Sequence, residues 1–221
     1  GAQPVPPNLV RHWKKYYPDM QFDNNYGLTE STGPGCVHLG VENERKLGAN
    51  GKPGFNWEVR IVDETGKDVP QGEVGELIVR GNGVMKEYYK NPERTKEAIR
   101  NGWLYTGDMA RMDSEDFIYL VDRKKDVIIT GGENIYPVEV EEVIRNHTKV
   151  YDVALIGIPD ERLGEIAAAV IEPKPDQSLA EDEIRTFCEQ NLPRYRQPRR
   201  IIFDKIPRNP TGKLRQKYAA N

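Results

Sequence analysis

The chain has 221 residues, of which 37% are apolar and 30% charged, and its formal net charge of -3 excludes a nucleic-acid-binding protein that is basic throughout. Two widely separated cysteines, Cys36 and Cys188, exclude a disulfide framework and a cysteine-rich zinc site. We recognise neither a secretory leader nor an apolar run long enough to cross a bilayer, so we expect no transmembrane segment and a cytoplasmic protein.

The first informative stretch is the motif "YGLTE", Tyr26 to Glu30. Within it, the Glu30 carboxylate is a suitable magnesium ligand and the Thr29 hydroxyl can bond a phosphate oxygen. Taken alone, such a pentapeptide is more often a surface turn. Further along, alternation of apolar and polar residues predicts two β-strands, at 59–62 and 76–79, separated by glycine-containing turns.

The next segment predicts a short helix followed by a strand, a turn and a strand. Asn91 is suited to cap the helix and Pro92 to occupy its first position, where no amide hydrogen is needed. The tetrapeptide "YTGD" is expected in the irregular opening of the strand pair, and its Asp108 can accept two hydrogen bonds from a ribose diol. Arg123, in "DRKKD", has a fork of donors suited to ribose or phosphate oxygens. An Asp after a Gly is more often a simple turn, and a charge run more often a solvated connector.

After "DRKKD" the pattern changes to alternating strands and helices. "YPVEVEEVIRN" predicts a helix with Val140, Val143 and Ile144 on one face, and "SLAEDEIRTFCEQNL" predicts another, opened by a capping box of Ser178 and Glu181. "VYDVALIGI", "EIAAAVIEP" and "RRIIFDKIP" are predicted strands. The whole chain therefore has a mixed α+β fold: a β-rich first part followed by a small α+β domain from about residue 125.

Two glycine-containing stretches of the second part carry candidate chemistry. "TGGEN", Thr130 to Asn134, resembles a phosphate cradle, although a glycine pair more often marks a turn. "NPTGK" places Lys213 on a tight turn, where its charge could meet a negatively charged transition state; a lysine at a loop tip more often faces solvent.

The motifs "YGLTE", "GELIVRGNGVMKEYY", "YTGD", "DRKKDVIITGGENIYPVEVE" and "NPTGK" occur in the order and at the spacing found in the acyl-adenylate-forming ligases, which include acyl-CoA synthetases, peptide-synthetase adenylation domains and firefly luciferase. The resemblance covers essentially all of the chain. It implies activation of a carboxylic acid with ATP and Mg²⁺ to an acyl-adenylate, followed by transfer of the acyl group to coenzyme A.

The resemblance also implies roles for individual residues. Lys213 is similar to the family's adenylation lysine, and Glu30 and Thr29 to the residues that hold magnesium and contact phosphate. Asp108 and Arg123 would hold the ribose. The adenine would lie against Tyr26 and the opening residues Gly1 and Ala2.

A division into two domains follows from the same resemblance. Residues 1–124 are expected to be the C-terminal part of the large adenylation domain, and 125–221 the complete mobile domain, which rotates about a hinge at Lys125. Rotation would exchange the lysine turn for the loop of Gly131, Gly132 and Glu133 beside the thiol tunnel. The family's lysine-ending phosphate loop is not found in the sequence, so we expect a fragment that is inactive by itself.

Alternatives remain open at this stage. The acid is expected to be a medium- or long-chain fatty acid, with aryl or alicyclic acids as alternatives, and the acceptor could be a carrier protein in place of coenzyme A. An oxidative, luciferase-like relative is a further enzymatic alternative. From a different class, a basic binding module could use "RYRQPRR" on nucleic acid, but that stretch has few aromatic residues for base stacking, so we expect no nucleic-acid partner.

Overall fold

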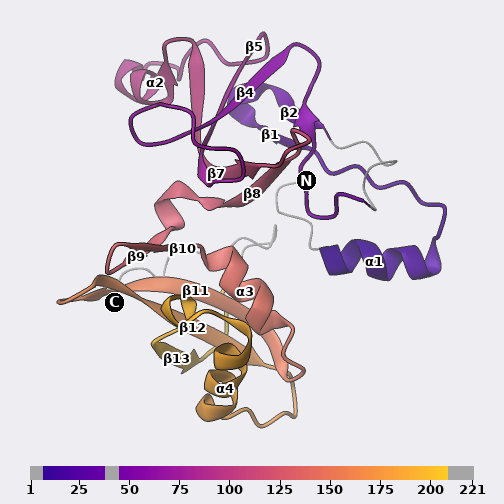
Figure 1. The fold of residues 1–221 in the computed structure, drawn as a ribbon, viewed down its shortest axis with the longest axis vertical. Coiled ribbons are helices and arrows are strands. Elements are labelled where there is room, and N and C mark those ends of the chain that lie inside the picture. The colour runs from indigo at the N-terminus through magenta and orange to yellow at the C-terminus, as the bar shows by residue number, and fades with distance from the viewer. Residues whose placement is uncertain (1–6, 38–44, 209–221) are drawn as a thin grey trace. The chain divides into compact units, whose positions relative to one another are not determined.

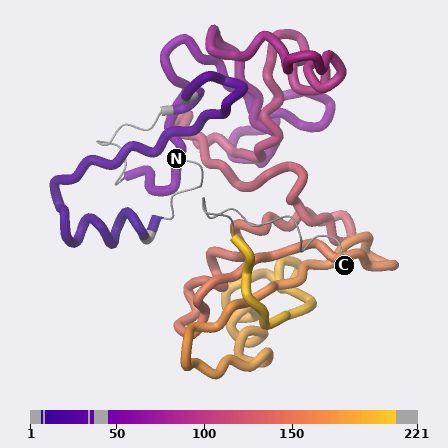
Figure 2. Tube along the Cα trace, turned by 180° about the vertical axis from the view of Figure 1, so that it is seen from behind, coloured from indigo at the N-terminus to yellow at the C-terminus, as the bar shows by residue number. Residues whose placement is uncertain are grey.

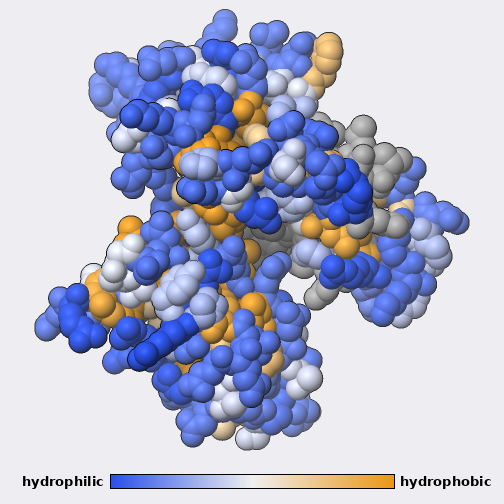
Figure 3. Space-filling view, viewed as in Figure 1, coloured by the Kyte–Doolittle hydropathy of each residue, from blue (hydrophilic) through white to orange (hydrophobic). Residues whose placement is uncertain are grey.

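The computed structural model describes residues 7–37 and 45–208. Packing contacts divide the chain into two compact units, Gly1–Lys124 and Lys125–Asn221. The first corresponds to the indigo-to-magenta part of the trace and the second to the orange-to-yellow part (Figures 1 and 2). The visible surface of each unit is mainly hydrophilic, with apolar patches between the charged groups (Figure 3).

The first unit contains a three-stranded and a five-stranded antiparallel sheet, in the strand orders β1-β2-β3 and β4-β5-β7-β6, with β8 also paired to β7. The strands are β1 (Tyr26–Leu28), β2 (Gly33–Val37), β3 (Lys52–Pro53), β4 (Trp57–Val62), β5 (Gly75–Gly81), β6 (Ile99–Arg100), β7 (Trp103–Met112) and β8 (Ile118–Arg123). The predicted strands at 59–62 and 76–79 are confirmed as parts of β4 and β5. In β5, Leu77, Ile78 and Val79 are all buried, so both of its faces are covered.

The predicted helix at Asn91 is confirmed as α2 (Pro92–Ala98). The Asn91 side chain accepts a hydrogen bond from the Arg94 amide at 3.1 Å, and Pro92 occupies the first turn. These are the local interactions that the sequence indicated, because amide groups at a helix start have no partner within the helix.

The first unit also holds elements that the sequence reading did not identify, including the strands β1, β2 and β3. The helix α1 (Pro7–Tyr16) precedes β1, and the 3₁₀ turn η1 (Thr29–Ser31) joins β1 to β2. Within 7–37 and 45–208, no helix combines the length and apolarity needed to cross a membrane.

The second unit is a five-stranded sheet with two helices on one face. The strands are β9 (Ile128–Thr130), β10 (Glu133–Ile135), β11 (Val150–Asp160), β12 (Gly164–Pro173) and β13 (Arg200–Phe203), and the helices are α3 (Pro137–Arg145) and α4 (Glu181–Asn191). The 3₁₀ turns η3 (Lys124–Asp126) and η4 (Arg194–Arg196) precede β9 and β13. β13 pairs parallel with β12, whereas the other pairs are antiparallel.

The core of this unit lies between the helices and one face of the sheet. Val140 and Ile144 of α3 are fully buried and Val143 packs against the same cluster, which confirms the predicted apolar face. Ile184 of α4 completes the cluster with side chains of β11 and β12. The mixed α/β fold expected from the sequence is therefore confirmed.

The capping box predicted for Ser178 and Glu181 is wrong. Ala180 is the N-cap of α4, no side chain caps this end, and Glu181 is already the first helical residue. Leu179 packs against the core cluster, so tertiary packing sets the path of the chain before the helix.

Candidate functional site

A bulge in β7 positions Asp108. β5 and β7 pair Ile78 with Tyr105 and Glu76 with Met109, so Leu77 alone faces the segment Thr106–Gly107–Asp108. A bulge of this kind bends the strand and redirects a side chain. "YTGD" therefore lies within a strand, not in an irregular opening as the sequence reading expected.

Hydrogen bonds fix the shape of this bulge. The Thr106 hydroxyl donates to the Leu77 carbonyl at 2.7 Å and accepts from the Asp108 amide at 3.1 Å. Gly107 has a φ of 70°, in the left-handed region that a residue with a Cβ adopts only at a cost. Glycine in the tetrapeptide is thus required by the backbone conformation.

The Asp108 carboxylate is buried and held at both oxygens. The Tyr26 hydroxyl donates to Oδ2 at 2.6 Å, and Arg123 Nε lies 2.7 Å from Oδ1. Burial, and secondarily the neighbouring Asp108, raises the pKa of Tyr26 far above its ordinary value, so the phenol stays a donor. Three residues predicted separately, Tyr26, Asp108 and Arg123, are thereby brought into one constellation.

This arrangement suits recognition of a vicinal diol. Each oxygen of a carboxylate can accept more than one hydrogen bond, so oxygens already oriented by protein donors can still accept from two adjacent hydroxyl groups. Hydrogen bonds to a charged acceptor are shorter and stronger than neutral ones. In this arrangement Tyr26 and Arg123 orient the Asp108 carboxylate.

Glu30 and Thr29 lie in η1, directly after β1. Tyr88, which the sequence analysis did not single out, donates its hydroxyl to Glu30 Oε1 at 2.8 Å, and the Met85 amide donates to the Glu30 carbonyl at 2.7 Å. Burial, and then Glu30, raises the pKa of Tyr88. Thr29 is exposed.

A magnesium ion that is held mainly by substrate phosphates needs one or two protein carboxylates. In the part of the chain that the structure describes, no group of three or more His, Cys, Asp and Glu could form a cage for a metal by itself. One oriented carboxylate at Glu30 fits the former kind of site, in which substrate phosphates supply most of the oxygen ligands.

Glu76 is a buried carboxylate that sequence reasoning missed. Its Oε1 accepts a hydrogen bond from the Gly107 amide at 3.2 Å, and its Oε2 lies 2.8 Å from Lys124 Nζ. The available signal was an acidic residue next to the apolar run of a buried strand, since such a side chain requires partners.

In the second unit, β9 and β10 form a hairpin around Gly131 and Gly132. Their φ angles are 57° and 89°, which are values of the tight turns that twist with a hairpin. The Gly131 amide donates to the Leu163 carbonyl at 2.9 Å, and Glu133 begins β10 and is exposed. The "TGGEN" stretch is thus a hairpin tip, and backbone conformation alone accounts for both glycines.

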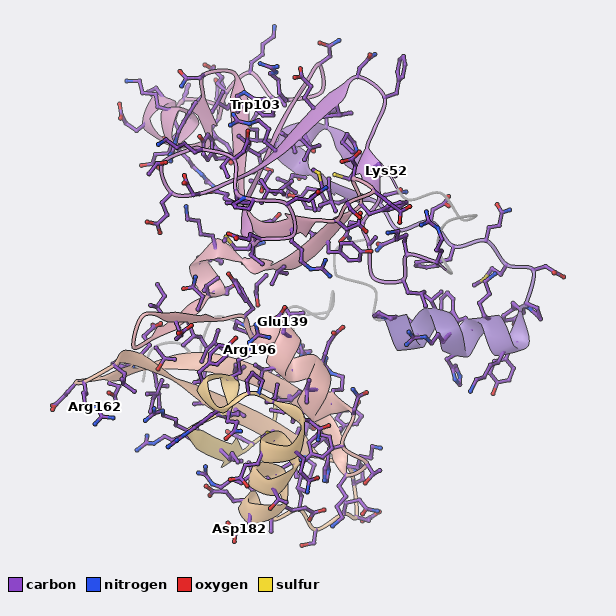
Figure 4. All side chains as sticks on the ribbon, viewed as in Figure 1. Lys52, Trp103, Glu139, Arg162, Asp182 and Arg196 are labelled. Atoms are coloured by element: carbon purple, nitrogen blue, oxygen red, sulfur yellow. The ribbon has the colours of Figure 1, made fainter. Side chains whose placement is uncertain are left out.

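An ion pair joins α3 to η4 in the same unit. Arg196 Nη1 lies 2.7 Å from Glu139 Oε2, and the two labelled side chains lie close together in Figure 4. Glu139 stands in the first turn of α3, where a carboxylate is stabilised by the helix dipole. Arg196, part of "RYRQPRR", is therefore engaged inside the unit.

Of the remaining predicted site residues, the structure describes one and leaves three outside its described residues. Lys125 lies in η3 and is exposed. Gly1, Ala2 and Lys213 fall outside the described residues.

Both units match known protein families. Residues 1–89 match the family described as AMP-binding enzyme, and residues 139–213 match the AMP-binding enzyme C-terminal domain. The long-chain-fatty-acid–CoA ligase FadD13 of Mycobacterium tuberculosis is 39% identical over 226 residues, covering 100% of this chain and 44% of that protein.

Two solved structures resemble the fold closely. The o-succinylbenzoate CoA synthetase MenE of Bacillus subtilis, in complex with the acyl-adenylate intermediate, matches with a TM-score of 0.88 and 33% identity over 97% of this chain and 43% of that one. ATP-bound MatB of Rhodopseudomonas palustris matches with a TM-score of 0.90 and 31% identity over 99% of this chain and 43% of that one. The chain thus spans less than half the length of these relatives.

Proposed function

The chain belongs to the AMP-binding enzymes, and from this premise we propose that it is part of an AMP-forming acid–thiol ligase. The complete protein would join a carboxylic acid to the α-phosphate of ATP, release pyrophosphate, and transfer the acyl group from AMP to coenzyme A. The observation that carries this proposal is the Asp108 carboxylate, buried and oriented by Tyr26 and Arg123.

In this proposal, Asp108 accepts hydrogen bonds from the ribose hydroxyls of ATP. Arg123 neutralises the buried carboxylate and orients it, and Tyr26 supplies both a donor to Asp108 and an aromatic surface beside the adenine. Gly1 and Ala2 complete the adenine environment on the strength of sequence resemblance alone.

Glu30 would contribute one carboxylate to a Mg²⁺ ion that is otherwise held by ATP, and Thr29 would contact phosphate. Such an ion, when bound, offsets charge on the phosphate oxygens. Tyr88 would keep the Glu30 side chain in one orientation through its hydroxyl group.

The second unit would serve both half-reactions. We propose that residues 125–221 form a mobile domain with its hinge at Lys125, and that Lys213 stabilises charge on the reacting carboxylate and phosphate during adenylation. The hairpin of Gly131, Gly132 and Glu133 would border the path of the coenzyme A thiol in the second half-reaction.

For the acid, we propose a medium- or long-chain fatty acid, because the 39% identical relative is named a long-chain-fatty-acid–CoA ligase. An aryl acid is the second candidate, since the similar MenE is named for o-succinylbenzoate. Free coenzyme A is the proposed acceptor. Both cysteines are buried and unbridged, so we place the protein in a reducing cytoplasm.

The test uses the full-length protein with ATP, Mg²⁺, coenzyme A and a panel of fatty and aryl acids. Acid-dependent exchange of pyrophosphate into ATP should report adenylation, and thioester formation should follow with fatty acids. Absence of both with every acid, from a folded protein, would contradict the proposal. We also expect the isolated 221-residue chain to be inactive, and steady thioester formation by it would refute that expectation.

A further inference from the structure

Glu76 and Asp108 are the two buried carboxylates within the described residues, with 7% and 5% of their surfaces exposed. They lie on adjacent strands, β5 and β7, and their cationic partners are the consecutive residues Lys124 and Arg123. A buried carboxylate without partners is costly, so each of these two groups depends on its own cation, and the two cations are neighbours in the chain.

The first oxygen of Glu76 supports the bulge that carries Asp108. Its Oε1 accepts from the amide of Gly107, the residue directly before Asp108. The bulge removes this amide from the regular pairing between β5 and β7, so the carboxylate supplies an acceptor that the neighbouring strand does not.

The second oxygen of Glu76 holds the end of the first unit. Its Oε2 binds Lys124, the last residue before the boundary between the two units. Arg123, one residue earlier, binds Asp108. The start of the connection to the second unit is thus held to the buried carboxylates Asp108 and Glu76 by two consecutive side chains.

We propose that Glu76 is a positioning residue with two separable tasks: through Oε1 it fixes the Asp108 bulge for ribose recognition, and through Oε2 it fixes the start of the linker between the units. The first task rests on the proposed function, in which Asp108 binds the ribose of ATP. The second task depends only on the fold.

Three substitutions in the full-length protein separate the two tasks. Glu76→Gln keeps a carbonyl oxygen for the Gly107 amide but loses the charge that holds Lys124. Lys124→Met removes the cation of the same ion pair. Glu76→Ala removes both the ion pair with Lys124 and the acceptor for the Gly107 amide. Glu58→Gln is the matched control, because Glu58 pairs with Arg80 on the exposed surface of the same sheet.

Two measurements test the two tasks of Glu76 separately. Ribose discrimination is the ratio of the dissociation constants of 2′,3′-dideoxy-ATP and ATP, determined by calorimetry. Linker order is the hydrogen exchange rate of backbone amides in residues 122–127, and it requires no activity. The melting temperature of each variant monitors the fold.

Glu76→Ala should lower ribose discrimination about tenfold, the effect of one lost hydrogen bond to a charged acceptor, whereas Glu76→Gln and Lys124→Met should keep it within about twofold. All three should accelerate linker exchange about tenfold, and Glu58→Gln should change neither quantity.

Unchanged discrimination and unchanged linker exchange in Glu76→Ala would overturn the proposal. Equal losses of ribose discrimination in Glu76→Gln and Glu76→Ala, in step with melting temperature, would also overturn it, because they would indicate a role in stability alone. If the unaltered protein does not bind ATP, the proposed function fails. Linker exchange in Lys124→Met still decides whether the ion pair between Glu76 and Lys124 fixes the start of the linker.

Discussion

Asp108 and Arg123 face each other as a register pair of β7 and β8, and Arg123 Nε lies 2.7 Å from Asp108 Oδ1. A cross-strand pair of opposite charge, with one member buried, fixes the carboxylate more firmly than a surface pair would. The variants described below are made in the full-length protein.

Replacing Asp108 with Asn should weaken ATP binding by about 10- to 100-fold, because the charged acceptor for two hydroxyl groups is lost. Dideoxy-ATP, which lacks both hydroxyls, should bind the variant and the unaltered protein within a few-fold of each other. Calorimetric titration with the two nucleotides is the measurement. An equal loss for both would argue against contact between Asp108 and the ribose.

Tyr26→Phe should reduce the sensitivity of the fold to alkaline pH. The pKa of Tyr26 in the folded protein is raised above the ordinary 10.0 by burial and by Asp108, so folding favours the protonated phenol. The contribution of this raised pKa to the free energy of unfolding is present below pH 10 and is lost as the pH rises further toward the pKa of Tyr26 in the folded protein.

Urea unfolding between pH 8 and pH 11 measures this effect. The variant should show a shallower decline in unfolding free energy than the unaltered protein, and Tyr16→Phe, at an exposed tyrosine, should decline like the unaltered protein. Parallel curves for all three proteins would show that the Tyr26 phenol does not titrate differently on folding.

Asp113 should link stability to acid pH. Burial acts to raise its pKa, but hydrogen bonds from Lys46 and from the amides of Glu115 and Phe117 lower it to about 2. Its stabilising contribution is therefore present above the ordinary value of 3.8 and is lost as pH falls toward about 2.

Asp113→Asn should lower the unfolding free energy at pH 7 by about 1–3 kcal/mol and flatten its pH dependence between pH 5 and pH 2. Denaturant titrations across this range measure both effects. Glu115→Gln, at a carboxylate that forms more exposed ion pairs, is the comparison. A variant curve as steep as that of the unaltered protein would assign the acid sensitivity to other carboxylates.

Gly132→Ala should affect the hairpin tip through the backbone. An added Cβ meets no atom within 4 Å, but the φ of 89° is unfavourable for alanine by about 1 kcal/mol. If the hairpin borders the thiol path, transfer to coenzyme A should slow while pyrophosphate exchange stays within twofold. Stopped-flow assays of each half-reaction measure this, and an equal effect on both would contradict the proposed division of tasks.

Lys213→Ala should lower the rate of adenylate formation by roughly 100- to 1,000-fold, the effect of removing one preorganised charge from an active site. Lys217→Ala, in the same basic stretch, should stay close to the unaltered rate. Pyrophosphate exchange measures both variants. Undiminished exchange in Lys213→Ala would remove this lysine from the chemistry.

Local sequence signals predicted the elements that depend on neighbouring residues. Asn91 and Pro92 start α2 because capping needs only residues a few positions apart. Ser178 shows the limit, because its motif was locally sound while packing of Leu179 placed the helix start elsewhere.

The sequence could not predict how the site is assembled. Tyr26 and Asp108 are 82 residues apart, and their contact depends on sheet pairing and on a register shift opposite Leu77. The partners of Glu30 and Gly107, which are Tyr88 and Glu76, were missed for the same reason. Family resemblance named the candidate residues, whereas the hydrogen bonds that orient them follow from tertiary structure alone.

The parallel pairing of β13 has a consequence for biosynthesis. Residues 200–203 join β12 in register with 168–171, and Ile206 packs with Ala154 and Val170 on the sheet face opposite the helices. Neither the fifth strand nor that apolar cluster can form until these residues have left the ribosome. The second unit should therefore reach its native state late during translation, and a stalled chain ending before residue 200 should be sensitive to proteases.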